Sequence, residues 1–167
     1  MRQESDVEQT IERYGDMVKH ICVVYMKNES DTEDVFQDVF LKYALFSEPF
    51  LSEEHRKAWL IRVTVNRCKD VLRSFFRRHT CSLEEAAFET DPGGEEHSDV
   101  LEAVLKLHDR YRILIYLHYY QGYSAVEIAE VLHKKINTVY TQLARARAEL
   151  KKMLGGDEDE SGDTECI

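Results

Sequence analysis

The chain has 167 residues, 43% of them hydrophobic, which is enough for one ordinary domain or two small ones with packed cores. No apolar run approaches the ~20 residues that span a bilayer, and the polar N-terminus is not typical of a signal peptide, so we expect a cytoplasmic protein that is not inserted in a membrane. Four scattered cysteines predict neither a disulfide framework nor a zinc site. Without a phosphate loop, a metal cluster or a nucleophile paired with a base, the sequence predicts no enzyme and no cofactor.

The net charge of −10 is unevenly distributed. Two basic blocks, residues 56–79 with +7 and 103–153 with +5, alternate with three acidic ones, residues 1–55 with −8, 80–102 with −8 and 154–167 with −6. This segregation predicts two nucleic-acid-binding surfaces and a basic protein partner for the acidic surface. It also predicts that the free protein binds DNA weakly, because its overall field repels phosphate.

Apolar residues recur at spacings of three and four, with no sustained alternation, which predicts an all-α fold. The expected helices cover about residues 6–26, 30–46, 55–78, 100–107, 110–121, 124–132 and 136–153. Ser30 and Glu33 have the spacing of a capping box at the start of the second helix. Pro49 and neighbouring turn formers predict a loop between the second and third helices.

The second helix is expected to carry an acidic face with an apolar edge. Its members follow the i, i+3, i+4, i+7 rule: Asp34, Gln37, Asp38 and Leu41. Spacing alone indicates no more than a solvated surface.

The third helix combines a core stripe with a second face of basic, amide and aromatic side chains. That face consists of Trp59, Arg62, Asn66, Lys69, Arg73 and Arg77. Positive charges at this spacing can follow a phosphate backbone, and Asn66 can pair with an exposed base edge. Trp59 can either stack on a base or pack in the core.

The composition of two acidic segments predicts the domain boundaries of the chain. Residues 79–99 are acidic and contain Pro92 and two glycines, which predicts a flexible linker between small helical domains over residues 1–78 and 100–153. The acidic segment 154–167 is predicted to be a disordered tail.

The last two predicted helices have the pattern of a helix-turn-helix. Ser124 and Glu127 form a capping box, Tyr123 and Ile128 occupy staple positions, and Val126 is expected on the buried side. The second helix has one narrow apolar stripe, and its other side carries Tyr140, Thr141, Gln142, Arg145 and Arg147. Such side chains can reach bases and phosphates in a major groove. By pattern alone, a helical hairpin with a solvated charged face is the alternative.

Four stretches resemble bacterial sigma factors, particularly the extracytoplasmic function (ECF) group. EIAEVL and TVYTQLARARAEL are similar to their promoter-binding helix-turn-helix, TEDVFQDVF resembles their docking signature, and AWLIRVTVNRCKDVLR resembles the segment that melts and recognises the minus-ten element. The resemblance covers about residues 8–78 and 100–153.

The resemblance implies a protein that is no enzyme itself, with core RNA polymerase, promoter DNA and an anti-sigma factor as partners. It implies that Asp34, Gln37 and Asp38, with Leu41 at the edge, dock on core polymerase. It assigns the third-helix face and the loop over residues 46–54 to the minus-ten element, with Asn66, Asp70 and Arg73 at recurrent polar positions. The outer side of the last helix would contact the minus-thirty-five element.

Four departures from the family pattern affect the expected sequence preference. The family usually has Gly at His133, an apolar residue at Lys134, and basic residues at Tyr140 and Gln142. A different class of function, a stand-alone helix-turn-helix regulator that binds duplex operator DNA as a dimer, accounts for residues 100–153 but leaves the second and third helices without a role.

Overall fold

The computed structural model describes residues 1–26, 28–78 and 99–155, and within them the fold is entirely helical. Its helices are α1 (Glu4–Tyr25), α2 (Glu29–Leu45), α3 (Glu53–Arg78), α4 (Asp99–Lys106), α5 (Asp109–Ile115), the π-helix η1 (Tyr116–Tyr120), α6 (Ala125–Leu132) and α7 (Ile136–Gly155). The all-α prediction is therefore confirmed. The predicted linker and tail lie outside the described residues, apart from α4's first residue, Asp99, and α7's last two, Leu154 and Gly155.

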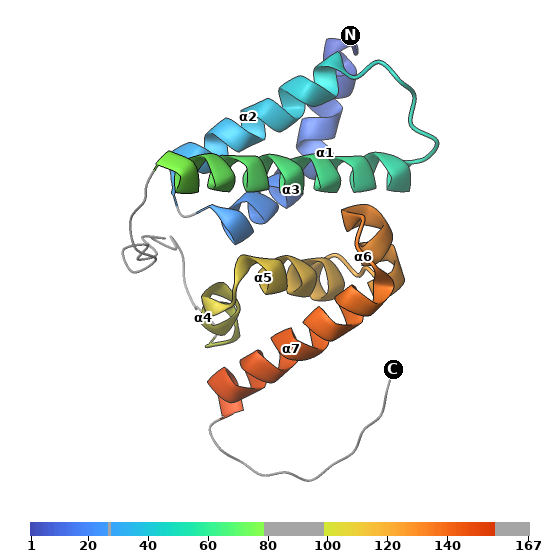
Figure 1. Ribbon diagram of the computed structural model, residues 1–167. Helices are drawn as coiled ribbons and strands as arrows, with labels where there is room; N and C mark the ends of the chain where they lie inside the picture. The colour runs from blue at the N-terminus through green and yellow to red at the C-terminus, as the bar shows by residue number, and fades with distance from the viewer. Residues whose placement is uncertain (27, 79–98, 156–167) are drawn as a thin grey trace.

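Helices α1, α2 and α3 pack against one another in a first bundle (Figure 1). Their apolar stripes meet in a core whose fully buried members include Val18, Ile21, Val35, Val39, Tyr43, Leu60, Ile61 and Val65. Cys22 and Cys68 are free thiols in this core. A hydrogen bond with Cys22, followed by burial, raises the pKa of the Cys68 thiol, so both cysteines act as small apolar side chains.

Helix α2 begins earlier than the Ser30–Glu33 capping box predicts. Asn28 is the N-cap, because its backbone is extended and its side-chain oxygen accepts a hydrogen bond of 2.7 Å from the Asp31 amide. Ser30 thus lies inside the helix. Two polar residues near one helix start compete for the same role, and asparagine is at least as good a cap as serine.

Helices α4 to α7 form a second bundle, in which α7 packs against α4, α5 and α6. Its core includes Ile113, Leu114, Leu117, Ile128, Val139, Leu143 and Ala146. The segment predicted as one helix over residues 110–121 is divided, since α5 widens into η1 for its last turn. Gly122 follows with a φ of 72°, a conformation that glycine adopts without steric cost.

The helix-turn-helix begins with the predicted capping box, and its turn contains a residue, His133, with a left-handed backbone. The Ser124 hydroxyl accepts from the Glu127 amide (3.2 Å), and the Glu127 carboxylate accepts from the Ser124 amide (2.7 Å), which confirms the capping box. Val126, expected to be buried, is 51% exposed. His133, between α6 and α7, has φ 53° and ψ 45°, the left-handed region that favours glycine.

Replacing His133 with glycine is expected to stabilise the second bundle by about 1 kcal/mol, because glycine avoids the clash of a Cβ in the left-handed conformation. Thermal unfolding should show the midpoint rising by a few degrees. His133→Ala keeps the Cβ and is the matched control, so it should give no such rise. An equal gain in both variants would mean that backbone strain at this residue is not the cause.

The two bundles also contact each other. Helix α1 lies against α5, and α3 lies against α6, so the long helix α3 runs between α2 and the second bundle (Figure 1). Among the described helices, none is long and apolar enough to cross a lipid bilayer.

Candidate nucleic-acid interfaces

Five side chains on α3, Arg62, Asn66, Lys69, Arg73 and Arg77, form what we call the basic face. Asn66, Arg73 and Arg77 are exposed, whereas Arg62 and Lys69 are half-buried. The guanidinium of Arg62 donates a hydrogen bond of 3.0 Å to the backbone carbonyl of Val131, and Arg73 forms an exposed ion pair of 3.5 Å with Asp70. The C-terminal half of the face is therefore accessible, and its N-terminal end is engaged by the second bundle.

Trp59 belongs to an aromatic cluster instead of the basic face. Its ring lies 4.9 Å from that of Phe46, 5.7 Å from that of Phe50 and 6.0 Å from that of Tyr43, measured between ring centres. Of the two roles that the sequence leaves open, packing is the one that the structure shows for this half-buried side chain. The cluster holds the loop between α2 and α3 against the first bundle.

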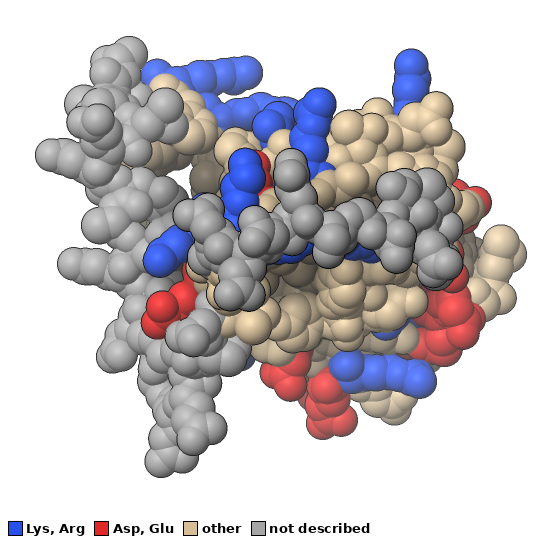
Figure 2. Space-filling model, turned by 90° about the horizontal axis from the view of Figure 1, so that it is seen from below, with Lys and Arg blue, Asp and Glu red and all other residues tan. Residues whose placement is uncertain are grey.

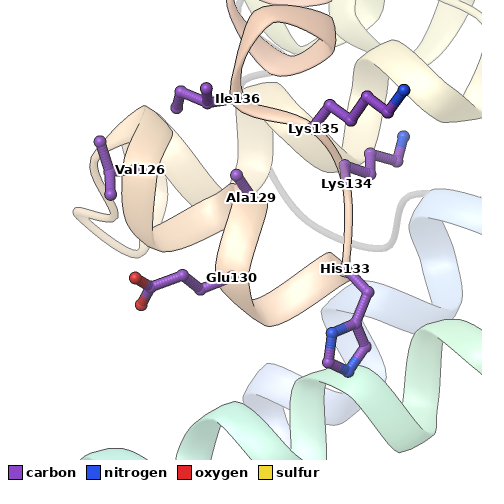
Figure 3. Close-up of a pocket in the computed structure, with 7 residues that line it drawn as sticks. All are labelled: Val126, Ala129, Glu130, His133, Lys134, Lys135 and Ile136. Atoms are coloured by element: carbon purple, nitrogen blue, oxygen red, sulfur yellow. The ribbon is translucent and has the colours of Figure 1, made fainter.

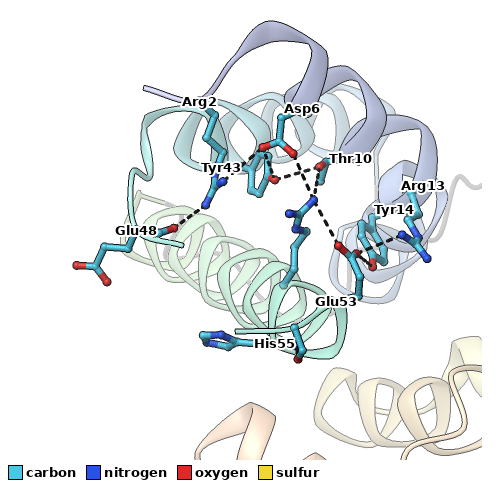
Figure 4. A network of polar contacts seen from close by, with 11 residues as sticks. Arg2, Asp6, Thr10, Arg13, Tyr14, Tyr43, Glu48, Glu53 and His55 are labelled. Carbon is cyan, nitrogen blue, oxygen red and sulfur yellow. Dashed lines mark hydrogen bonds and ion pairs between the residues drawn. The ribbon is translucent and has the colours of Figure 1, made fainter. Parts of the chain in front are cut away.

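Arg2 fixes the same loop from the N-terminus, and the sequence carries no signal for it. Its guanidinium lies 4.7 Å from the ring centre of Tyr43 and 4.8 Å from that of Phe50, and it donates a 2.7 Å hydrogen bond to the Glu48 carbonyl. Asp6 joins Arg2 to the rest of a polar network that crosses the three helices (Figure 4). These contacts order the loop that the resemblance assigns to the minus-ten element.

The acidic face of α2 is exposed at both ends and paired with α3 in its middle. Asp34 and Gln37 are exposed, and Leu41 is 60% exposed. Asp38 instead accepts a hydrogen bond of 2.7 Å from Arg67 on α3, which links the two helices. The carboxylate most available to a partner on this face is therefore that of Asp34.

The outer side of α7 presents Tyr140, Thr141 and Arg145 to solvent. Tyr140 is 50% exposed, and the Thr141 hydroxyl donates to the Asn137 carbonyl (2.9 Å), a bond within the helix. Gln142 is half-buried and accepts from the Lys134 ammonium (3.2 Å), so it is less available than the other three.

Arg147 is directed toward η1. Its Nε donates a hydrogen bond of 2.7 Å to the Tyr119 hydroxyl, and a second guanidinium nitrogen lies 3.4 Å from Nε2 of His118. Spacing along α7 could not reveal these contacts, because both partners lie in another helix. Part of the Arg147 guanidinium is therefore already engaged within the protein.

An open hollow of about 480 Å³ lies beside the turn, between α6 and the start of α7 (Figure 3). Val126, Ala129 and Ile136 supply apolar side chains to it, and Lys134 and Lys135 extend from the turn. Burial lowers the pKa of Lys134, and the nearby charges of Lys69 and Arg110 lower it further. Of these two residues, Lys69 belongs to the basic face of α3, so the charge of Lys134 adds to the positive potential near that face.

In Figure 2, most of the visible lysines and arginines lie in the upper half of the view, and most of the visible aspartates and glutamates lie in the lower half. Within the described part of the chain, no group of three His, Cys, Asp or Glu side chains could hold a metal ion. Two helical bundles, one ending in a helix-turn-helix and the other carrying a basic and an acidic face, are the arrangement expected of a DNA-binding protein.

Comparisons with known proteins identify the family of DNA-binding proteins to which the chain belongs. Residues 10–78 match the family model of sigma-70 region 2, and residues 97–150 match that of sigma-70 region 4. RNA polymerase sigma factor SigV of Bacillus subtilis is 31% identical over 125 residues, which cover 73% of this chain and 75% of that protein. ECF RNA polymerase sigma factor SigW of the same organism is 26% identical over 161 residues, 86% of each chain.

A solved structure, that of CnrH in complex with the cytosolic domain of CnrY, is similar over 93% of this chain and 92% of its own, with a TM-score of 0.60 and 26% identity. The chain therefore belongs to the ECF-type sigma factors, the RNA polymerase subunits that direct transcription. Since region 2 is matched as well as region 4, the stand-alone regulator is not favoured.

Proposed function

We propose that this chain binds core RNA polymerase through the exposed part of the α2 face and brings two DNA-binding helices to a promoter. The main support is the exposure of one side of α2. Asp34, Gln37 and Leu41 lie side by side there, and the opposite side of the helix is buried in the first bundle. An exposed leucine beside a carboxylate suits a basic partner that also offers apolar contact.

The two DNA-binding helices would act at different stages. Tyr140, Thr141 and Arg145 project from α7 as a helix-turn-helix requires for contact with a duplex major groove, here the minus-thirty-five element. Asn66, Arg73 and Arg77 on α3 would bind the strand that separates at the minus-ten element, because an amide recognises an unpaired base edge and arginines bind phosphate. Catalysis of RNA synthesis would belong to the polymerase, in the cytoplasm.

An anti-sigma protein is a further proposed partner. The similar structure of CnrH was solved with the cytosolic domain of CnrY bound. The exposed apolar and acidic side chains on α2 offer a surface that such a protein could cover.

The polymerase dependence of DNA binding tests the proposal. With a net charge of −10, the chain alone should retain little promoter duplex at physiological salt, and addition of core polymerase should produce a specific complex. Gel shift on genomic promoter fragments, with and without core polymerase, measures this. Tight, specific binding by the chain alone would instead support the stand-alone regulator.

A further inference from the structure

Arg2 contacts the loop between α2 and α3, residues 46–52, with its side chain and the end of α2 with its main chain. Its backbone amide donates a hydrogen bond of 2.8 Å to the carbonyl of Ala44. Its guanidinium donates to the Glu48 carbonyl (2.7 Å) and lies 4.8 Å from the centre of the Phe50 ring. The arginine side chain is 14% exposed, so it packs against the loop instead of extending into solvent.

The position of Arg2 is itself fixed by Asp6 on α1 (Figure 4). The Asp6 carboxylate lies 3.4 Å from the Arg2 guanidinium and accepts a hydrogen bond of 2.9 Å from the Tyr43 hydroxyl. It also lies 3.4 Å from the guanidinium of Arg56 on α3, which is 5.6 Å from the centre of the Phe50 ring. The loop is thus joined to all three helices of the first bundle, since an arginine and a planar ring attract each other.

Other residues of the same loop remain exposed. Ser47 and Pro49 are accessible, and Leu51 is 92% exposed. The Leu51 amide donates to Nδ1 of His55 (3.1 Å), so its main chain is held while its side chain is free. A loop with a fixed main chain and exposed side chains is pre-organised for binding, because little conformational entropy is lost when a ligand arrives.

We propose that Arg2 is a positioning residue for recognition of the minus-ten element. It holds the loop between α2 and α3 in the conformation that contacts the separated strand, and so determines base preference at one position without touching DNA. The inference rests on the proposed binding of that strand by the first bundle. Arg2 lies outside residues 10–78, which match sigma-70 region 2, so the match assigns it no role.

The fluorescence of Trp59 reports whether Arg2 holds the loop. Trp59 is the single tryptophan of the chain, and its ring centre lies 4.9 Å from that of Phe46 and 5.7 Å from that of Phe50. In the Arg2→Ala variant of the full chain, release of the loop should expose the indole ring. Acrylamide should then quench its fluorescence more strongly than in the unmodified protein.

Arg13→Ala is the matched control. It removes another arginine before the middle of α1, but the ion pair of Arg13, at 3.3 Å, is with Glu53 at the start of α3 and not with the loop. The quenching of Trp59 should therefore stay unchanged. Circular dichroism of both variants should show the helical content of the unmodified chain.

Base preference is measured with the holoenzyme and a pool of single-stranded DNA that contains a randomised segment. Bound strands are sequenced, and the ratio of the preferred base to the others is determined at each position. This ratio does not depend on the fraction of protein that is folded, so a general loss of stability leaves it unchanged.

Arg2→Ala should lower the base ratio at one position by about fivefold or more, because one correctly held base contributes about fivefold to 150-fold discrimination. Asn66→Ala, which changes the basic face of α3, should lower the ratio at a different position. Arg13→Ala should leave every ratio unchanged.

Phe50→Leu tests whether Arg2 acts through the loop. It removes the ring that Arg2 contacts and keeps an apolar side chain in its place. Two residues that act through one contact give effects that do not add. The double variant Arg2→Ala with Phe50→Leu should therefore lose little more base discrimination than either single variant.

Unchanged base ratios in Arg2→Ala overturn the inference, and so do equal reductions at every position or losses that multiply in the double variant. The failure of the proposed function is recognised separately. In that case the unmodified holoenzyme enriches no base in the strand, which removes the basis of the inference as well, whereas the response of Trp59 to Arg2→Ala persists.

Discussion

Asp34→Lys is expected to weaken binding to core RNA polymerase by several kcal/mol, because it would place a like charge against the basic surface that the acidic face of α2 is proposed to contact. Asp34 is exposed, so the helical content and the stability of the first bundle should change little. A pull-down or fluorescence titration with core polymerase measures the loss.

Glu33→Lys is the matched control, since it makes the same change of charge at the adjacent position, which is also exposed but lies on a different side of α2. Equal losses in both variants would indicate a general effect of charge and would contradict docking by the Asp34 side. Asp38→Lys is a less direct test, because it also breaks the ion pair with Arg67.

Arg145→Ala should cost about 1 to 3 kcal/mol of initial promoter binding by the holoenzyme, because a charged and bidentate donor is removed from the major groove. Filter binding at fixed salt, under conditions that prevent strand opening, measures this. The result would correspond to a loss of affinity of about fivefold to 150-fold.

Arg147→Ala is a control of the same chemistry two residues away. The guanidinium of Arg147 already bonds to Tyr119, so the loss of promoter affinity should be smaller than for Arg145. A larger loss for Arg147 would mean that it leaves Tyr119 to contact DNA, and the assignment of the outer side of α7 would then be wrong.

Patterns that act within one helix were predictable from the sequence. Ser124 and Glu127 are three residues apart and bond to each other as the capping box requires. The apolar spacings of α1, α3 and α7 likewise predicted most of the buried side of each helix, and Val18, Ile61 and Leu143 are all in the core. Near the C-terminal ends of α3 and α7 the same spacing was wrong, since Phe75 and Met153 are 53% and 43% exposed. Local periodicity carries this information because side chains three or four apart share one helix side.

Contacts between helices were not predictable in the same way. The spacing that puts Arg62 and Arg147 on outer faces is correct, yet each is engaged by a partner from another element, the Val131 carbonyl and the Tyr119 hydroxyl. Trp59 was ambiguous for the same reason, since its aromatic neighbours come from α2 and the following loop. Arg2 lies before residue 10, where the region 2 match begins, and only the folded structure shows what it does.

Permanganate footprinting of unpaired thymines in the holoenzyme–promoter complex distinguishes the proposed role of α7, binding of duplex DNA, from that of α3, binding of the separated strand. Asn66→Ala should leave closed-complex affinity nearly unchanged and slow the appearance of reactive thymines, because its partner base is accessible only after unstacking. Arg145→Ala should reduce closed-complex affinity and leave opening normal once the complex has formed. Equal losses of closed-complex affinity in both variants, with normal opening in both, would mean that α3 and α7 do not act at different stages.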